Sequence, residues 1–245
     1  MKGYEPIMTF GEDNAAVYDD LSQRGDEEAT VGFLEDLAHG GPALELAIGT
    51  GRIAVPLAAR GVSVDGIDFS PPMVAKLRAK PGGEALSVTM GDFADVGVDG
   101  TYSLVYIVFN SFFNLLTQDD QVRCFENVAT HLDEGGSFVV EGGFTLGFLD
   151  HLRAGQYVEA ESIEVDAVGF DLLRIDPAAQ MLYENHVRLS HDTVSFNPVV
   201  QRYAWPSELD LMARIAGLGL DQRWGGWDRE PFTADSGNVI SVYRR

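Results

Sequence analysis

The sequence predicts a doubly wound α/β fold built on a mostly parallel, Rossmann-like sheet. Apolar, β-prone runs alternate with helical patterns from residue 43 to residue 141, which is the order typical of βαβ units. These runs read as strands buried on both faces, as in parallel sheets covered by helices. A glycine turn at Gly49 and Gly51 follows the first strand, and ligands in such sheets bind beyond the carboxyl ends of the strands.

The elements are expected in the following order. Residues 12–39 carry the pattern of two helices with a break near Ser22–Gly25, and Gly40 to Pro42 end the second helix. Thr117 begins a capping pattern, and Gly135 with Gly136 is expected to end the helix that follows it. The remaining strands are expected at 43–48, 62–67, 85–90, 102–109 and 137–141, and the remaining helices at 51–60 and 70–80.

The pattern changes after Gly143. Residues 155–204 contain β-rich runs separated by turn signals such as Asp176-Pro177 and Asn197-Pro198, which predict an antiparallel inserted sheet. A helix is expected from Pro206 to Ala216, and two last strands at 222–224 and 239–243 should form an antiparallel hairpin at the sheet edge. The expected organisation is an N-terminal helical lid (1–40), a core domain (41–142 and 205–245) and a β insertion (143–204).

Composition limits the partners and the compartment. The net charge is −21 and the only lysines are Lys2, Lys76 and Lys80, whereas a protein that binds nucleic acid or an anionic membrane needs concentrated basic residues. No apolar run approaches the roughly 20 residues that span a bilayer, and the N-terminus does not resemble a signal peptide. With a single cysteine, Cys124, a reducing cytoplasm is the expected location.

The most informative segment is the strand and turn from Leu44 to Ala54. Gly49 and Gly51 let the backbone approach a ligand and adopt positive φ, and free N–H groups at the start of a helix can hold a polar ligand group. The turn alone is ambiguous, because Gly49 to Ala54 also fits the dinucleotide pattern G-x-G-x-x-A.

Three carboxylates separate these interpretations. Glu45 stands four residues before Gly49, Asp68 ends the second strand, and Asp92 follows the third strand. Asp68 could accept both hydroxyls of a ribose, and Asp92 could accept from an adenine amino group while Phe93 and Met73 cover the ring. Each acid also has a structural alternative: a strand-edge acid for Glu45, a helix cap for Asp68 and a turn residue for Asp92.

Together these residues resemble the class I S-adenosylmethionine-dependent methyltransferases, over residues 41–142 and more loosely over 205–245. Glu45-x-Ala47-x-Gly49-x-Gly51 is similar to that family's first motif, E/D-x-G-x-G-x-G, with Ala47 in place of the usual first glycine. The resemblance implies that Glu45 orients the turn or contacts the methionine amine, that Asp68 binds ribose and that Asp92 binds adenine. The implied set for S-adenosylmethionine is Tyr18, Glu45, Ala47, Gly49, Thr50, Gly51, Asp68, Phe69, Met73, Gly91, Asp92, Phe93 and Phe109.

The acceptor side is less defined. The fourth strand ends in an aromatic segment, residues 108–114, and lacks the N/D-P-P-Y/F signature of enzymes that act on amides or nucleobase nitrogens. In the segments Phe10–Tyr18, Phe109–Phe113 and Arg202–Pro206 the chain also resembles the natural-product tailoring methyltransferases, including N-methyltransferases. This resemblance implies a small-molecule acceptor. The residues expected to take part in catalysis are Tyr18, Phe112, Phe113 and Glu141, and those expected to bind the acceptor are Phe10, Phe113, Tyr203 and Trp205.

Alternatives remain open for these residues. One of Phe112 and Phe113 could belong to the core, and Tyr203 and Trp205 could simply attach the insertion to the sheet. The histidines offer no convincing base, since one in a β-rich run, such as His186, is more often structural. An amine acceptor bound in its neutral form needs no base, whereas a hydroxyl acceptor needs a base or a metal, so N-methylation is favoured over O- or C-methylation.

No set of residues has the spacing of metal ligands, so no metal is expected. Two rival functions remain: an NAD(P)-dependent oxidoreductase, favoured only by the G-x-G-x-x-A match, and a protein that binds S-adenosylmethionine without catalysis. The apolar residues of the lid and the insertion are compatible with a homo-oligomer, and equally with a single chain that buries them itself.

Overall fold

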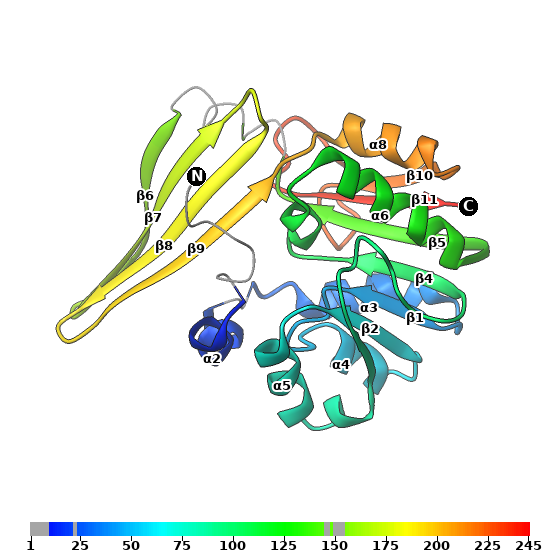
Figure 1. Ribbon diagram of the computed structural model, residues 1–245, viewed down its shortest axis with the longest axis horizontal. Helices are drawn as coiled ribbons and strands as arrows, with labels where there is room; N and C mark the ends of the chain where they lie inside the picture. The colour runs from blue at the N-terminus through cyan, green and yellow to red at the C-terminus, as the bar shows by residue number, and fades with distance from the viewer. Residues whose placement is uncertain (1–9, 22–23, 145–147, 149–154) are drawn as a thin grey trace.

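A computed structural model describes residues 10–21, 24–144, 148 and 155–245. Two sheets form the molecule, one of seven strands and one of four (Figure 1). The large sheet has the order β10-β11-β5-β4-β1-β2-β3, and its pairs are parallel except for the two made by β11, which runs antiparallel to β5 and β10. The predicted doubly wound fold with an antiparallel terminal hairpin is confirmed.

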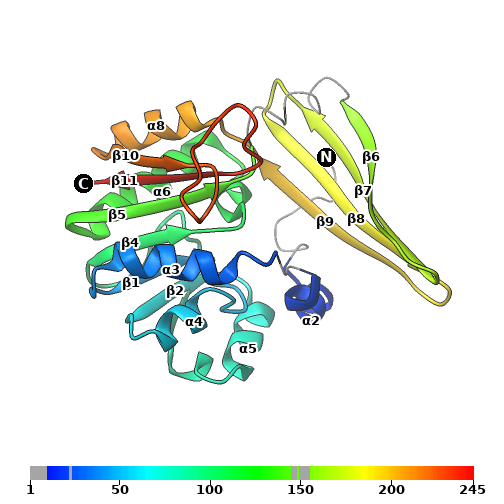
Figure 2. The ribbon, with the colours of Figure 1, turned by 180° about the vertical axis from the view of Figure 1, so that it is seen from behind.

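The strands of the large sheet are β1 (Ala43–Leu46), β2 (Val64–Asp68), β3 (Ser87–Met90), β4 (Tyr102–Ile107), β5 (Leu132–Gly142), β10 (Gly219–Trp224) and β11 (Val239–Arg244). Helices α3 (Glu27–Ala38), α4 (Ala54–Ala59) and α5 (Pro71–Ala79) lie against one face, and α6 (Gln118–His131) and α8 (Pro206–Ile215) cover the other (Figures 1 and 2). The short helices η1 (Gly83–Ala85) and η2 (Ser111–Asn114) and the N-terminal α2 (Glu12–Leu21) complete the described helices.

Local chemistry explains several boundaries. The Thr117 side chain accepts from the Asp120 N–H and begins α6, as its capping pattern predicts. Helix α4 begins at Ala54 rather than Gly51, because Gly51 has a φ of +73° that is incompatible with a right-handed helix. The expectation that Gly135 and Gly136 end α6 is wrong: α6 ends at His131, and both glycines lie inside β5, where the pairing with β4 shifts register.

The insertion is a four-stranded antiparallel sheet, as predicted. It consists of β6 (Gln156–Ile163), β7 (Ala167–Asp176), β8 (Met181–Ser190) and β9 (Val194–Arg202), paired in that order. Its two faces differ because side chains alternate along each strand. One face, which we call the inner face, carries Asn197 and Gln201, whose side chains contact α2 and the end of β4. The other, which we call the outer face, carries Val158 and Phe196.

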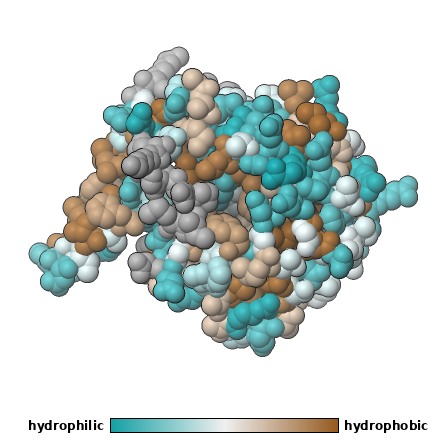
Figure 3. Space-filling view, viewed as in Figure 1, coloured by the Kyte–Doolittle hydropathy of each residue, from teal (hydrophilic) through white to brown (hydrophobic). Residues whose placement is uncertain are grey.

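The outer face carries several exposed apolar side chains, although Val187 and Val200 on the same face are each 3% exposed. Val158 is 64% exposed and Phe196 is 61% exposed, and hydrophobic side chains extend along the insertion in the space-filling view (Figure 3). Single exposed apolar residues are common, but several on one sheet face mark a surface able to pack against another body. Within the described part of the chain, no helix has the length and apolar character needed to cross a bilayer.

Candidate active site

The glycine turn follows β1 and uses three residues with positive φ. Ala47, Gly49 and Gly51 have φ values of +57°, +55° and +73°. A side chain at Gly51 would be crowded, since a Cβ there would lie 3.0 Å from both Leu77 Cδ1 and Val55 Cγ2. Ala47 takes the same left-handed region with a methyl group, at a cost of about 1 kcal/mol. The turn therefore needs glycine on both conformational and steric grounds at Gly51.

Asp68 joins the turn to the next helix. Its Oδ2 accepts from the Gly49 N–H at 2.7 Å, and its Oδ1 accepts from the Ser70 N–H at 2.7 Å. The side chain is 5% exposed, and this burial raises the pKa of Asp68 against the opposing effect of the N–H donors. Ser70, rather than Asp68, caps α5 by accepting from the Met73 N–H. Asp68 is therefore fixed beside the turn, at the carboxyl end of β2.

Glu45 lies deeper than the sequence suggests. It is 2% exposed, and one of its oxygens accepts from the Tyr106 hydroxyl at 3.0 Å, across the β1–β4 pair. Burial raises the pKa of Glu45 to about 8, although the Tyr106 hydroxyl and the charge of Arg52 oppose the shift. The carboxyl group is therefore mostly protonated at neutral pH.

The end of β3 carries the third acid in an open position. Asp92 is exposed, and its Oδ1 accepts from the Ala94 N–H at 2.8 Å, which is the turn geometry considered as its structural alternative. Phe93 and Met73 are 4% and 2% exposed, so each offers a ligand little surface. Gly91 donates its N–H to the Asp68 carbonyl. The acids at β2 and β3 therefore end adjacent strands.

The end of β4 is a cluster of aromatic and cationic groups around Phe109. The Phe109 and Asn110 backbones have φ values of +58° and +59°, a strained pair of the kind that collects at functional sites. Arg52 and Arg24 lie over the Phe109 ring, with Cζ 4.8 and 5.3 Å from its centroid. Tyr18 from α2 meets the same ring edge-on at 6.5 Å.

Glu141 accepts hydrogen bonds from the residues around Phe109. Its Oε2 accepts from the Phe109 N–H at 2.7 Å, and its Oε1 accepts from Arg24 at 2.6 Å and from Asn238 at 2.8 Å. The residue is 2% exposed. A carboxylate that is this fully paired positions the β4 end and the Arg24 segment, and its lone pairs are engaged. We therefore assign Glu141 a positioning role and no longer expect it to act as a base.

Helix α2 lies across the turn. Thr50, at the turn, donates to Asp19 at 2.5 Å, and Lys80 pairs with the same carboxylate at 2.7 Å. The Ser70 hydroxyl donates to the Phe10 carbonyl, and the Phe10 ring meets Phe69 edge-on at 5.9 Å. Figures 1 and 2 both show α2 between α5 and the insertion. A hollow of about 410 Å³ opens behind the turn, lined by Asp19, Gly25, Glu27, Gly51, Arg52, Val55, Pro56 and Lys80.

Comparisons with known proteins agree on one family. A model described as a methyltransferase domain matches residues 43–136. The putative methyltransferase YqeM of Bacillus subtilis strain 168 is 30% identical over 168 residues, which cover 66% of this chain and 68% of that protein. The structure of the CcbJ methyltransferase from Streptomyces caelestis has a TM-score of 0.90 at 38% identity and covers 96% of this chain and 97% of that chain.

The chain belongs to the S-adenosylmethionine-dependent methyltransferases. The cypemycin N-terminal methyltransferase of a Streptomyces species is also similar, at 28% identity over 211 residues that cover 82% of each protein. Membership decides against the nicotinamide-dependent alternative, and it makes S-adenosylmethionine the cofactor. The residues present fit that cofactor: the Asp68 carboxylate stands beside the glycine turn at the end of β2, and Asp92 is exposed after the neighbouring strand β3.

Two of the aromatic residues expected at the methyltransferase's cleft are in its core instead. Phe112 is 0% exposed and packs against Phe125, and Phe113 is 1% exposed and packs against Phe144. A Cβ at Gly142 would lie 2.7 Å from Phe113 Cε2, so the backbone of β5 closes over this ring. The expectation that Phe112 and Phe113 line the cleft is wrong, because η2 turns both rings into the interior.

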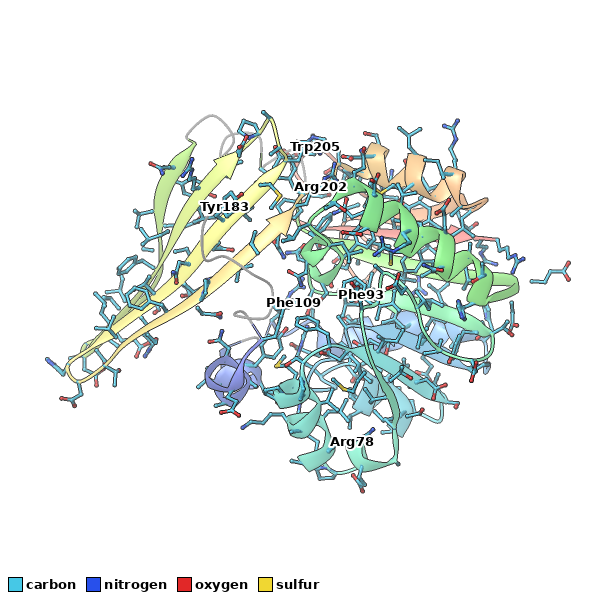
Figure 4. All side chains as sticks on the ribbon, in the orientation of Figure 1. Arg78, Phe93, Phe109, Tyr183, Arg202 and Trp205 are labelled. Carbon is cyan, nitrogen blue, oxygen red and sulfur yellow. The ribbon has the colours of Figure 1, made fainter. Side chains whose placement is uncertain are left out.

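The expectation that Tyr203 binds the acceptor is also wrong. It is 2% exposed and contacts Phe144, Phe148 and Trp205, so it attaches the insertion to the methyltransferase core, which was its structural alternative. Trp205 is partly exposed, and it lies with Arg202 at the junction of β9 and α8, well apart from Phe109 (Figure 4). Roles for Phe10 and Trp205 in acceptor binding stay predictions.

Sequence reasoning missed several groups of the methyltransferase. Arg24 and Arg52 meet at Phe109 from positions 28 residues apart, and only Arg52, directly after Gly51, could have been suspected from the motif. A second group, with ligand atoms within 4.8 Å of one another, comes from three strands of the insertion and consists of Glu161, Asp171 and His186. No local spacing could reveal it, because antiparallel pairing creates it.

Proposed function

We propose that this methyltransferase transfers a methyl group to an amine nitrogen of a small molecule. The proposed binding of S-adenosylmethionine rests on Asp68, a buried carboxylate that accepts a hydrogen bond from the Gly49 N–H at the switch point of the sheet. The preference for nitrogen rests on the lack of a free base around Phe109 among the described residues, and on the similarity to a protein named as an N-terminal methyltransferase.

In this proposal Asp68 accepts from the ribose hydroxyls, and Asp92, in its exposed position, accepts from the adenine amino group. Arg52 and Arg24 are placed to bind the methionine carboxylate, since they bring two guanidinium groups to the β4 end. When bound, the cofactor supplies an electrophilic methyl group on a sulfonium.

The residues around Phe109 then have two tasks. Tyr18 and Phe109 present aromatic rings that stabilise a nearby cation. Helix α2, fixed by Asp19 to Thr50, closes over the turn and excludes water. Rate enhancement therefore comes from positioning donor and acceptor in line, and Glu141 contributes by holding the Phe109 backbone. The acceptor lies between α2, the end of β4 and the inner face of the insertion.

The direct test replaces Asp68 with alanine. Removing a carboxylate with charge-assisted hydrogen bonds should weaken S-adenosylmethionine binding by at least about 30-fold, corresponding to roughly 2 kcal/mol. Calorimetric titration measures this, with the exposed Asp99→Ala as the matched control. Unchanged affinity in Asp68→Ala would remove the proposed cofactor site.

The acceptor class is tested by turnover. A set of amines, phenols and amino sugars, scored by donor consumption and product mass, should yield methylated amines. Methylation of phenols alone would move the assignment to oxygen. Cofactor binding without turnover on any acceptor would favour the non-catalytic alternative.

A further inference from the structure

The inner face of the insertion looks toward the proposed acceptor site at two points. Asn197 accepts from the Asn14 side chain of α2 at 2.6 Å, and Gln201, four residues along β9, donates to the Asn110 carbonyl at the end of β4 at 3.3 Å. Residues two or four apart on a strand share a face, so both contacts come from the inner face of β9.

A histidine and an aspartate occupy this inner face beside Asn197. Pairing across the strands aligns Asp171 of β7, His186 of β8 and Asn197 of β9 in one row. His186 Nδ1 lies 2.6 Å from an Asp171 oxygen, and Glu161 on β6 completes a group with ligand atoms within 4.8 Å. The His186 side chain is 36% exposed, so it can meet a ligand while Asp171 fixes its ring.

The charge state of His186 suits hydrogen bonding in both directions. Burial lowers the pKa of His186, but the Asp171 hydrogen bond and the carboxylates of Glu184 and Glu161 outweigh it and raise the pKa to about 8. At neutral pH the ring is mostly an imidazolium. Its Nε2 lies 3.8 Å from a Glu184 carboxylate oxygen, which is beyond hydrogen-bond distance, so the Nε2–H can donate to a ligand while the carboxylate oxygens accept. An anionic ligand would be repelled by three acids, whereas neighbouring hydroxyl or amine groups fit both kinds of partner.

The other described histidines do not share this setting. Both ring nitrogens of His131 are engaged by backbone carbonyls, those of Asn127 and Val98. His191 is exposed in the turn between β8 and β9, and His39 is exposed at the end of α3. His186 is therefore the histidine on the inner face within the described part of the chain.

Distance decides what His186 can do. At about 3.3 Å per residue, the four residues from Gln201 to Asn197 separate the β4 end from this row by about 13 Å. A general base must lie within hydrogen-bond reach of the reacting atom, so His186 does not serve the nitrogen being methylated.

We propose that His186 and Asp171, with Glu161, form a distal acceptor subsite that binds a hydroxyl- or amine-bearing ring. The imidazole Nε2–H donates to one ring substituent, and a carboxylate accepts from its neighbour. The acceptor then spans from the β4 end to the insertion, which selects molecules of at least two rings. This inference rests on the proposed function, because it assumes that the acceptor lies between α2, the end of β4 and the inner face of the insertion.

The test follows the histidine resonances by NMR with the intact chain. The probes are neamine, a two-ring molecule rich in amines and hydroxyls, and its single ring 2-deoxystreptamine, each added with sinefungin at about 0.15 M salt. Neamine should shift the His186 resonance saturably, and 2-deoxystreptamine should not. The His186→Gln spectrum assigns the resonance, and His191 reports non-specific attraction of a cation to a chain of charge −21.

Calorimetry adds a quantitative arm. His186→Gln and Asp171→Asn should each weaken neamine binding about tenfold, as expected for one charge-assisted hydrogen bond, and leave S-adenosylmethionine affinity unchanged. A silent His186, equal shifts of His186 and His191, or equal effects of both probes would overturn the subsite. So would a divalent metal retained at these residues after EDTA treatment, detected by native mass spectrometry.

The two hypotheses fail separately. If the wild-type chain did not bind S-adenosylmethionine, the proposed function would be wrong. The neamine titration, repeated without sinefungin, would still test the subsite in that case. Intact cofactor binding with no response at His186 would sink the subsite alone.

Discussion

The two sheets of this methyltransferase use hydrophobic residues in opposite ways. In the large sheet, Leu104 and Val105 of β4 point to opposite faces and are both 0% exposed, because helices cover both sides. In the insertion, Phe196 and Val158 on the outer face are 61% and 64% exposed. The large sheet is thus covered on both faces by helices of its own chain, whereas the outer face of the insertion carries apolar side chains that are exposed.

The large sheet and the insertion therefore have different constraints on their side chains. In a sheet buried on both faces the strand ends are closely packed, and Asp68 and Glu45 are held there by hydrogen bonds to the Ser70 N–H and the Tyr106 hydroxyl. In the insertion, exposed side chains such as Phe196 and Val158 can change at little cost in stability. The insertion is therefore the part in which acceptor specificity can vary while the cofactor site is preserved.

The largest expected effect contrasts one phenylalanine from each sheet region. Phe125 on α6 is 0% exposed and touches Phe112, Phe138 and Tyr243, so Phe125→Ala should lower the free energy of unfolding by about 4 kcal/mol. Phe196→Ala should change it by less than about 0.5 kcal/mol. Urea denaturation measures both. A large loss in Phe196→Ala would mean that the outer face is covered, and gel filtration of that variant would then show whether a second copy covers it.

A smaller effect concerns the pH dependence of stability. Because burial raises the pKa of Glu45 to about 8, the folded state favours the protonated carboxyl group. The contribution of Glu45 to the free energy of unfolding is therefore greatest below the unfolded pKa of about 4.5, and it is lost as the pH rises through 8. Glu45→Gln removes this loss. Between pH 5 and pH 8 the variant should gain about 3 kcal/mol relative to the wild type.

Chemical denaturation at a series of pH values checks this expectation. The matched control is Glu134→Gln, at an exposed position in the same sheet. A pH profile for Glu45→Gln that runs parallel to the wild type would show that Glu45 is ionised in the folded protein.

The smallest effect is expected at the glycine turn. Ala47 has a φ of +57°, so Ala47→Gly relieves left-handed strain but adds freedom to the unfolded chain, for a net stabilisation below about 1 kcal/mol. Thermal unfolding measures the change, with Ala58→Gly in helix α4 as a control that should destabilise by a similar amount. Destabilisation by Ala47→Gly would show that its methyl group packs favourably.

The part of the large sheet that forms the cofactor site could be predicted from local sequence patterns. The turn at Gly49 and Gly51, Asp68 after a β-prone run, and the cap at Thr117 are short patterns whose physical causes act within a few residues. Glu45 was placed correctly on β1, but its near-complete burial and its partner Tyr106 depend on which strand lies beside it.

Aromatic residues were the least predictable. Phe112 and Phe113 carry the same sequence signal whether they face a cleft or the core, and the short helix η2 turns both inward. Tyr203 and Trp205 share one segment, yet one is buried and the other partly exposed. The hydrophobicity of a side chain therefore does not say which surface it packs against, or whether it is buried at all.

By itself, the sequence determined the alternation of strands and helices, the glycine turn and the acids at the ends of the first three strands, because hydrophobic periodicity and backbone geometry act over short range. Tertiary structure decided that Glu141 is engaged by Arg24 and the Phe109 N–H, and that Asp171 meets His186. Those contacts join residues that are distant in the chain. Their net free energy is therefore decided only when the folded structure brings the residues together and excludes water from them.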